Sequence, residues 1–235
     1  EAAVARRPVV AILATGDELV PPGTLPGPDQ IVSSNPTGIA ALVRRAGGVA
    51  RELGIAPDRM EALAARIAEA KDADVLVTIG GASVGDHDLV AAALKQQGLD
   101  LAFWKIALRP GKPLMFGRLG ATRVLGLPGN PVSALITGRV FLVPLIHALL
   151  GMPRTEPATE TAILTVPLEA NGPRLHLMRA KLGRDARGGL TVTPFPSQDS
   201  SLLSALAQAD CLIRRAPGAA AAEAGAVGEV ERLDG

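Results

Sequence analysis

Apolar positions along the first 150 residues form either unbroken runs or runs with helical spacing. The run over residues 8–15 predicts a strand buried on both faces of a sheet, and further strands are predicted over residues 50–56, 74–81, 101–108, 113–117 and 122–127. The runs with helical spacing predict helices over residues 36–46, 58–72, 88–97 and 131–150. This alternation favours a three-layer α/β domain, a mostly parallel sheet with helices on both faces.

Three of these helix starts carry residues that can cap them. Asn35 and Asn130 each stand directly before a proline, the usual order of an N-cap and a first helical residue. Asp58 stands three residues before a glutamate, which is the spacing of a capping box. We therefore expect all three side chains to satisfy backbone N–H groups at helix starts.

The pattern changes after residues 151–159 (GMPRTEPAT), a proline-rich linker. Beyond it, short alternating runs predict strands in ETAILTVPL, RLHLMRAKL, GLTVTPF, CLIRRA and GEVERL, and one short helix in SSLLSALAQ. We expect residues 1–152 to form the α/β domain and residues 158–235 to form a small all-β, barrel-like domain.

Composition narrows the function classes. The net charge is +1 and no basic run is interleaved with aromatic residues, so no nucleic-acid partner is expected. The single cysteine, Cys211, excludes an internal disulfide and a cysteine metal cage, and we expect it to be a small buried residue. No membrane span is expected, because the most apolar stretch, residues 140–152, is too short and contains Pro144 and His147. The sequence opens on Glu1 without a secretory signal, which favours a fragment or processed product and a cytoplasmic location.

Polar or glycine-rich segments follow the ends of several predicted strands. They are TGDEL (15–19), GGASVGDHD (80–88), RPGKP (109–113) and LPGNP (127–131). Because ligands of open parallel sheets bind outside the carboxyl ends of the strands, we expect these four segments to converge on one site.

The segment GGASVGDHD offers two kinds of chemistry. Gly80, Gly81 and Gly85 leave backbone N–H groups free to surround an anion. Asp86 and Asp88 could hold a hard cation such as Mg²⁺, which prefers oxygen ligands. Asp88 could equally cap the helix that follows it, and both roles are compatible.

Residues 81–85 (GASVG) also match the G-x-S-x-G pattern of serine hydrolases. Ser83 would be the nucleophile and His147 or His176 the base. Four residues, 84–87, however, separate Ser83 from the next predicted helix, which in that fold begins directly after the serine. Both histidines fall in a predicted helix or strand, so the hydrolase is the weaker alternative.

Further candidates stand at the other strand ends. Glu18 places a carboxylate at the end of the first strand, and Lys112 can pair with an oxyanion. Asn130 and Pro131 open a helix whose free N–H groups, with Ser133, favour an oxyanion. No Walker A or G-x-G-x-x-G segment is present, which argues against a standard ATPase or dinucleotide enzyme.

With TGDEL, SSN, GGASVGDHD, FWKIALRPGKPLMFG and GLPGNPVSAL in this order, the sequence resembles the molybdopterin molybdenumtransferase family, which includes bacterial MoeA proteins and the gephyrin E domain. LHLMRAKL and PSQDSSLLSALAQADCLI resemble its C-terminal domain. The resemblance implies a molybdopterin-binding α/β fold followed by a β-barrel. It implies an enzyme that inserts molybdate into adenylylated molybdopterin and releases AMP with Mg²⁺. It also implies a homodimer, with molybdopterin adenylyltransferase and molybdoenzymes as protein partners. A non-catalytic molybdopterin-binding or scaffold module is the alternative.

The resemblance also implies roles for single residues. Glu18, Asp58 and Asp88 match the family's functional acids, with Glu18 and Asp88 as metal ligands. Pro128 and Pro131 match the family's functional prolines. The residues that the family associates with oxyanion or molybdate binding match Lys112, Ser133, Arg179 and Ser200 or Ser201.

Three departures from the family pattern stand out. Ser33 replaces an acid before the SN pair, and Asp58 lies between Pro57 and Arg59 where the family often has paired acids. The family's N-terminal region has no counterpart in these 235 residues. From that third departure we expect this portion to bind ligand without completing turnover.

Overall fold

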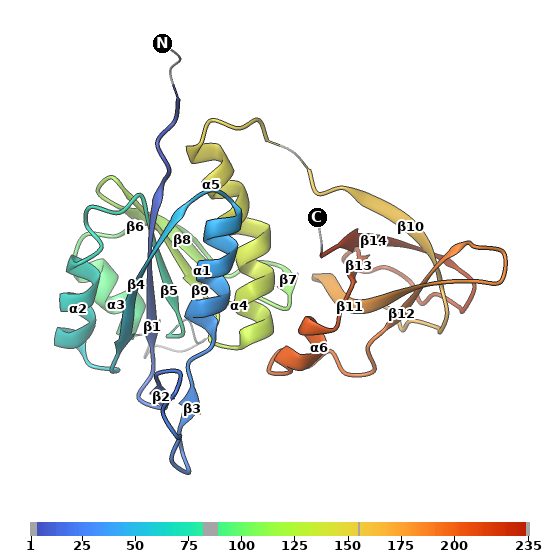
Figure 1. Ribbon diagram of the computed structural model, residues 1–235, viewed down its shortest axis with the longest axis horizontal. Coiled ribbons are helices and arrows are strands. Elements are labelled where there is room, and N and C mark those ends of the chain that lie inside the picture. The colour runs from blue at the N-terminus through green and yellow to red at the C-terminus, as the bar shows by residue number, and fades with distance from the viewer. Residues whose placement is uncertain (1–3, 82–88, 155, 234–235) are drawn as a thin grey trace. The chain divides into compact units, whose positions relative to one another are not determined.

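The computed structural model describes residues 4–81, 89–154 and 156–233, and the chain divides into two compact units (Figure 1). The first unit comprises Glu1–Ile106 and Gly111–Arg154. The second comprises Ala107–Pro110 and Thr155–Gly235. The expected single strand over residues 101–108 is therefore wrong, because its last residues leave the first unit and pair with a strand of the second.

A six-stranded sheet forms the centre of the first unit, in the order β4-β1-β5-β9-β8-β6. In that order the strands are Val49–Ala56, Val9–Thr15, Val75–Ile79, Thr122–Leu127, Met115–Leu119 and Asp100–Trp104. The first four strands are parallel. At one edge β8 pairs antiparallel with β9, and β6 pairs antiparallel with β8. The expected mostly parallel sheet is confirmed.

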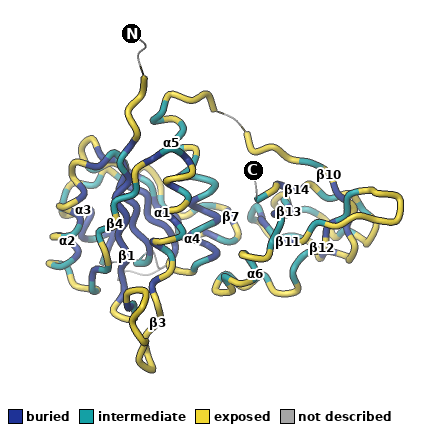
Figure 2. Tube along the Cα trace, viewed as in Figure 1, coloured by how far each residue is buried: buried dark blue, intermediate teal, exposed yellow. Residues whose placement is uncertain are grey.

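Helices cover both faces of this sheet. They are α1 (Asn35–Arg45), α2 (Met60–Ala68), α3 (Leu89–Gln96), and a continuous run of α4 (Pro131–Thr137), the π-helix η1 (Gly138–Leu142) and α5 (Val143–Leu149). Strand β1 is buried along its length (Figure 2) and divides its side chains between two cores. Val10 and Ile12 pack with α1 and the α4–α5 run, whereas Ala11 and Leu13 pack with α2 and α3. The three-layer arrangement is thereby confirmed.

The run from Pro131 to Leu149 is the one helix in the described part of the chain that is long and apolar enough to cross a membrane, by length and composition only. In this fold Ile136, Leu142 and Ile146 of that run are buried in the core. Its middle widens into a π turn, in which Val143 donates its N–H to the carbonyl of Gly138. The predicted helix over residues 131–150 is otherwise confirmed.

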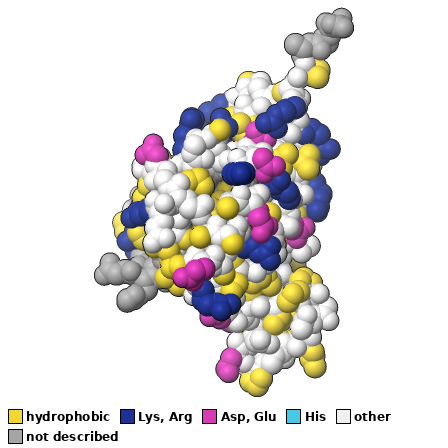
Figure 3. All heavy atoms as spheres, turned by 90° about the vertical axis from the view of Figure 1, so that its left-hand side faces the viewer, with side chains coloured by type: hydrophobic (Ala, Val, Ile, Leu, Met, Phe, Trp, Pro, Cys, Tyr) yellow, Lys and Arg dark blue, Asp and Glu magenta, His cyan; other side chains and the backbone are white. Residues whose placement is uncertain are grey.

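An arm formed by residues 19–33 projects from the first unit. Its two short strands, β2 (Leu19–Val20) and β3 (Ile31–Val32), pair in parallel, and Leu25 in the loop between them is 92 % exposed. Figure 3 shows the arm as the protrusion at the lower right, with hydrophobic side chains and few charged ones. The apolar pattern of the sequence did not predict this arm.

The second unit is a closed five-stranded barrel in the order β12-β10-β14-β13-β11, with β11 pairing back to β12. Its elements are β7 (Leu108–Arg109), β10 (Thr159–Leu164), β11 (Leu175–Arg184), β12 (Leu190–Pro194), α6 (Leu203–Ala207), β13 (Cys211–Arg215) and β14 (Val227–Arg232). β7 adds to β11 outside the ring. The expected small all-β barrel is confirmed.

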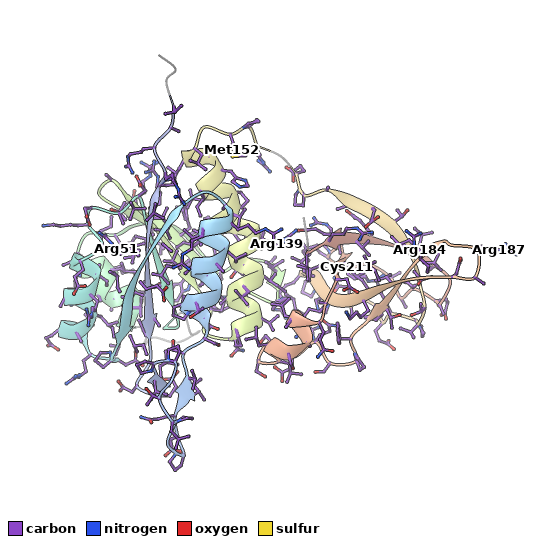
Figure 4. All side chains as sticks on the ribbon, viewed as in Figure 1. Arg51, Arg139, Met152, Arg184, Arg187 and Cys211 are labelled. Carbon is purple, nitrogen blue, oxygen red and sulfur yellow. The ribbon has the colours of Figure 1, made fainter. Side chains whose placement is uncertain are left out.

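Cys211 lies in the apolar interior of this barrel (Figure 4). Burial raises the pKa of its thiol to about 12. The thiol therefore stays protonated and unreactive in the folded protein, in agreement with the expected core role. Arg184 and Arg187 stand at the tip of the β11–β12 hairpin in the same view.

Candidate functional site

The carboxyl ends of the parallel strands bring three of the four predicted segments to one edge of the sheet. The N–H of Gly16 donates to the carbonyl of Ala56 over 3.3 Å, and the N–H of Gly80 donates to the carbonyl of Leu127 over 3.2 Å. These bonds join the ends of β1 to β4 and of β5 to β9. TGDEL, the start of GGASVGDHD and LPGNP therefore lie side by side.

Two glycines of this edge are required by close approach. Gly80 has φ +97°, and a Cβ there would lie 2.6 Å from the carbonyl oxygen of Thr15. Gly81 has φ +65°, and its Cβ would lie 2.2 Å from Cγ2 of Val90. Larger residues would clash and strain the backbone at both positions. The remaining candidates of this segment, Ser83, Gly85, Asp86 and Asp88, lie outside the described residues.

Carboxylates gather at the ends of β1 and β4. The Glu18 side chain folds back over Gly16, where a Cβ would lie only 2.5 Å from Oε2 of Glu18. Oδ1 of Asp17 accepts a hydrogen bond from the backbone N–H of Asp58 over 3.0 Å. Burial raises the pKa of Asp58, and the charges of Asp17 and Glu18 raise it further. Asp17, Glu18 and Asp58, here called the acid group, therefore interact electrostatically.

The expected capping box at Asp58 is wrong. Helix α2 begins at Met60, its N-cap is Arg59, and no side chain caps it. Asp58 is thus one residue outside the cap position, and its own N–H is held by Asp17. Asp58 therefore interacts with Asp17 and Glu18 instead of capping the helix.

The acid group is a candidate site for Mg²⁺. Among residues 4–81, 89–154 and 156–233, no three His, Cys, Asp or Glu side chains stand close enough to hold a metal ion. Carboxylate oxygens are nevertheless the donors that Mg²⁺ prefers, and it is commonly bound by one or two carboxylates together with substrate phosphates. The donor chemistry fits Mg²⁺, with phosphates completing the ligand set.

The LPGNP segment opens the long helix as expected. Asn130 is the N-cap of α4 and Pro131 is its first residue, although no side chain caps this end. Pro128 is buried and Ser133 is 5 % exposed. Because the first turn of a helix leaves N–H groups without carbonyl partners, this segment can offer donors to an anion.

Asn35 plays a different part from the expected one. The N-cap of α1 is Ser34, and Asn35 is already the first helical residue. Its side-chain amide donates instead to the carbonyl oxygen of Gly129 over 2.6 Å. The bond joins the start of α1 to LPGNP across 94 positions of the chain. No local signal in the sequence predicts this bond, because an asparagine before a proline can either cap a helix or bond to a distant carbonyl.

Lys112 is exposed, and it closes a narrow loop at the point where the chain returns to the first unit after residues 107–110. The loop is closed by a hydrogen bond of 2.9 Å from the N–H of Ile106 to the carbonyl of Lys112, and by one of 2.8 Å from Lys105 to Leu114. Arg109 and Pro110 of the same RPGKP segment belong to the second unit, and the peptide bond between them is cis.

Arg179 lies in the second unit and is only 1 % exposed. Its guanidinium donates to the carbonyl oxygens of Leu202, Ser197 and Asp199 at 3.1, 3.3 and 2.9 Å. Burial lowers the pKa of Arg179, whereas the charge of Asp199 opposes that shift. Its donors therefore hold the loop 197–202, and the partly buried Ser200 is part of that loop.

The two histidines proposed as bases lie in different units. His147 is on α5, and His176 is buried in β11. Burial lowers the pKa of His176 to about 4, and four arginine charges lower it further: those of Arg109, Arg174, Arg179 and Arg215. His176 is thus neutral at physiological pH.

Comparisons with known proteins agree with this architecture. Residues 11–148 match the family described as "Probable molybdopterin binding domain", and residues 161–233 match "MoeA C-terminal region (domain IV)". The chain is 38 % identical over 206 residues to the molybdopterin molybdenumtransferase of Haemophilus influenzae, covering 87 % of this chain and 51 % of that protein. It is 35 % identical over 219 residues to molybdopterin molybdenumtransferase 2 of Mycobacterium tuberculosis, covering 91 % and 53 %.

A solved structure shows the same fold over nearly the whole chain. The molybdopterin biosynthesis MoeA protein from Pyrococcus horikosii superimposes with a TM-score of 0.83 at 30 % identity, covering 98 % of this chain and 55 % of that one. The chain thus spans about half the length of the relatives it matches.

Proposed function

The chain belongs to the MoeA family of molybdopterin-binding proteins, and from that premise we propose that it is part of an enzyme that inserts molybdenum into molybdopterin. The substrate is the adenylylated pterin, and AMP is released. In this proposal residues 1–152 carry the molybdopterin site, and residues 158–235 form the barrel that contains Arg179 and Ser200.

One observation carries the proposal: the acid group and the LPGNP helix start lie at the same edge of the sheet. Acids suit a cation and a phosphoanhydride, whereas a helix start suits an oxyanion. A substrate whose phosphates react in the presence of molybdate needs the acids and the helix start close enough for one bound molecule to reach both.

Different residues of this chain have different roles in the proposed reaction. Glu18 and Asp58 present carboxyls at the strand ends, and Gly80 and Gly81 let the backbone pass close to Thr15. Pro128, Asn130, Pro131 and Ser133 fix the helix start. Lys112 offers an exposed cation for molybdate. Arg179 acts by holding the loop of Ser200, since three of its five N–H donors are bonded to carbonyls of that loop.

Mg²⁺ would be held by Glu18 and Asp88, the latter outside the described residues, together with phosphate oxygens of the substrate. When bound, such an ion polarises a phosphoanhydride and favours its cleavage. Ser83, Gly85 and Asp86 complete the proposed phosphate loop.

The family also supports the wider setting of the proposal. We propose a cytoplasmic homodimer that receives its substrate from a molybdopterin adenylyltransferase and passes its product to molybdoenzymes. Because the chain spans half the length of its relatives, a binding or scaffold role without turnover is the second candidate.

Isothermal titration with molybdate tests the oxyanion assignment. We expect Lys112→Ala to weaken binding at least about tenfold through loss of the cation. Lys95→Ala, which removes an exposed lysine from α3, is the matched control and should bind as the wild type does. Equal affinity of the Lys112→Ala variant and the wild type would remove Lys112 from the site.

Turnover is tested separately in the full-length protein, by release of AMP from adenylylated molybdopterin in the presence of Mg²⁺. We expect release to require the metal and to fall strongly in Glu18→Gln. Molybdate binding without metal-dependent AMP release would favour the binding-module alternative.

A further inference from the structure

A hollow of about 440 Å³ opens beside the acid group, on the side of β4. Gly16 and Asp17 line one wall, and residues from the arm, the start of α1 and β4 line the others. Its volume falls in the usual range of small-molecule sites. Nothing in the proposed chemistry of phosphates and molybdate uses it.

The walls of the hollow are mainly rigid and apolar. Pro21, Pro22, Pro36 and Pro57 all line it, together with Leu19. Proline rings are apolar and conformationally restricted, so they offer a preformed surface to a flat ligand. Among the described residues that line it, none is a lysine or arginine, which argues against a phosphate or another anion as the occupant.

Its polar groups are acceptors and hydroxyls. The Asp17 carboxylate is exposed at the wall next to the acid group. Ser33 is 7 % exposed, and its hydroxyl makes no hydrogen bond within the described part of the chain. This hydroxyl is therefore free to bond to a molecule in the hollow. Glu52 is less available, since Arg44 lies 3.6 Å from its carboxylate.

β4, the edge strand of the sheet, has a bulge where it borders the hollow. In the β1–β4 pairing Ile12 faces Glu52 and Leu13 faces Gly54, so Leu53 is an extra, bulged residue. Gly54 has φ +82°, and a Cβ there would have no atom within 4 Å. Bulges commonly re-aim edge strands next to functional sites, and this one leaves open space at the wall.

We propose that this hollow binds an amino-substituted nitrogen heterocycle of the substrate, flat against the prolines, with N–H groups of the ring or of its amino substituent donating to Asp17 and Ser33. The inference rests on the proposed function, because Asp17 also holds the N–H of Asp58 and so places the ring beside the acid group. Two parts of an adenylylated pterin have this chemistry. The pterin edge offers two adjacent N–H donors, which match one carboxylate, and adenine offers its exocyclic amine.

The test uses probes without phosphate, so that only the ring site is measured. The 235-residue chain is titrated with 6-hydroxymethylpterin, followed by its fluorescence, and with adenosine, followed by calorimetry. We expect saturable binding of one ring per chain, and the preferred probe identifies which part of the substrate occupies the hollow. Thr37→Trp, at an exposed lining position of α1, should weaken binding at least about tenfold by filling the hollow.

Ala65→Trp places the same side chain at an exposed position of α2 outside the hollow, and should bind as the wild type does. Ser33→Ala should weaken binding through loss of the hydroxyl. The proposal fails if neither probe binds saturably, or if Thr37→Trp binds the preferred probe like Ala65→Trp. Molybdate titration of the same variants separates the two proposals: retained Lys112-dependent binding would leave the proposed function standing while the ring site fell.

Discussion

The side-chain amide of Asn35 donates to the carbonyl oxygen of Gly129 over 2.6 Å, and so fastens LPGNP to the start of α1. Asn35→Asp keeps the size of the side chain but turns its donor into an acceptor that faces another acceptor. We expect the free energy of unfolding to fall by about 1–2 kcal/mol, measured by urea denaturation. Molybdate affinity should fall as well, because the helix start is no longer fixed.

The control for this variant is Gln96→Glu, which makes the same amide-to-carboxylate change at an exposed position of α3. It should shift the free energy of unfolding by no more than about 0.5 kcal/mol. If Asn35→Asp behaved like Gln96→Glu in both measurements, the bond to Gly129 would have no positioning role.

Arg179 supports the loop 197–202 through three carbonyl oxygens. Arg179→Lys cannot reproduce this planar fork, because an ammonium is a compact charge on a flexible stem. We expect the second unit to lose about 2–3 kcal/mol, and proteases to cut the loop in the variant but not in the wild type. Arg187→Lys, at the exposed hairpin tip, is the control and should change neither. An intact loop in Arg179→Lys would show that the carbonyl bonds are not what orders it.

The sheet and helices of the first unit could be predicted because each element is fixed by its own pattern. Unbroken apolar runs such as residues 74–81 occur where a strand is covered on both faces. The pattern failed at residues 105–110, where the chain leaves one unit to pair with β11 of the other. It also failed at the arm, since Leu25, Ile31 and Val32 are apolar yet exposed.

The candidate site shows a similar division. The strand-end rule placed Glu18, Gly80 and Asn130 at one edge from sequence alone, because parallel strands end on the same side. Helix caps were less predictable, since Asn35 and Asp58 stand one position away from the cap they were expected to fill. Their groups instead take part in contacts to Gly129 and Asp17, residues far apart in sequence. Local spacing carries no information about such contacts.

Replacing two buried threonines of the first unit by valine should change the free energy of unfolding differently. The hydroxyl of Thr78 is fully buried on β5 and has no hydrogen-bond partner among the described residues. The hydroxyl of Thr122 is also buried but donates to the carbonyl of Ala73 over 2.9 Å. Thr78→Val should therefore leave stability unchanged or raise it by about 1 kcal/mol, whereas Thr122→Val should lower it by about 1–2 kcal/mol. Urea denaturation of both variants measures the difference, and equal losses would indicate that the Thr78 hydroxyl is bonded.

His176 makes the stability of the second unit depend on pH. Burial, assisted by four surrounding arginines, lowers the pKa of His176 from 6.5 to about 4 in the folded protein. Between these values the unfolded chain binds a proton that the folded chain does not. The contribution of His176 is therefore complete above about pH 6.5 and is lost as the pH falls toward 4, with a total on the order of 2 kcal/mol.

Because carboxylates titrate in part of the same range, the measurement compares the wild type with His176→Gln. The probe for urea unfolding at each pH is Cys211, which is buried in the same barrel. Each sample is brought to a fixed alkaline pH and given a brief pulse of thiol reagent. The labelled fraction of Cys211 then measures the unfolded fraction. The free energy of unfolding should rise more steeply from about pH 4 to 6.5 in the wild type than in His176→Gln. His147→Gln, which removes a histidine from α5, should keep the wild-type slope. Parallel pH curves for the wild type and His176→Gln would mean that His176 takes up its proton as readily in the folded barrel as in the unfolded chain.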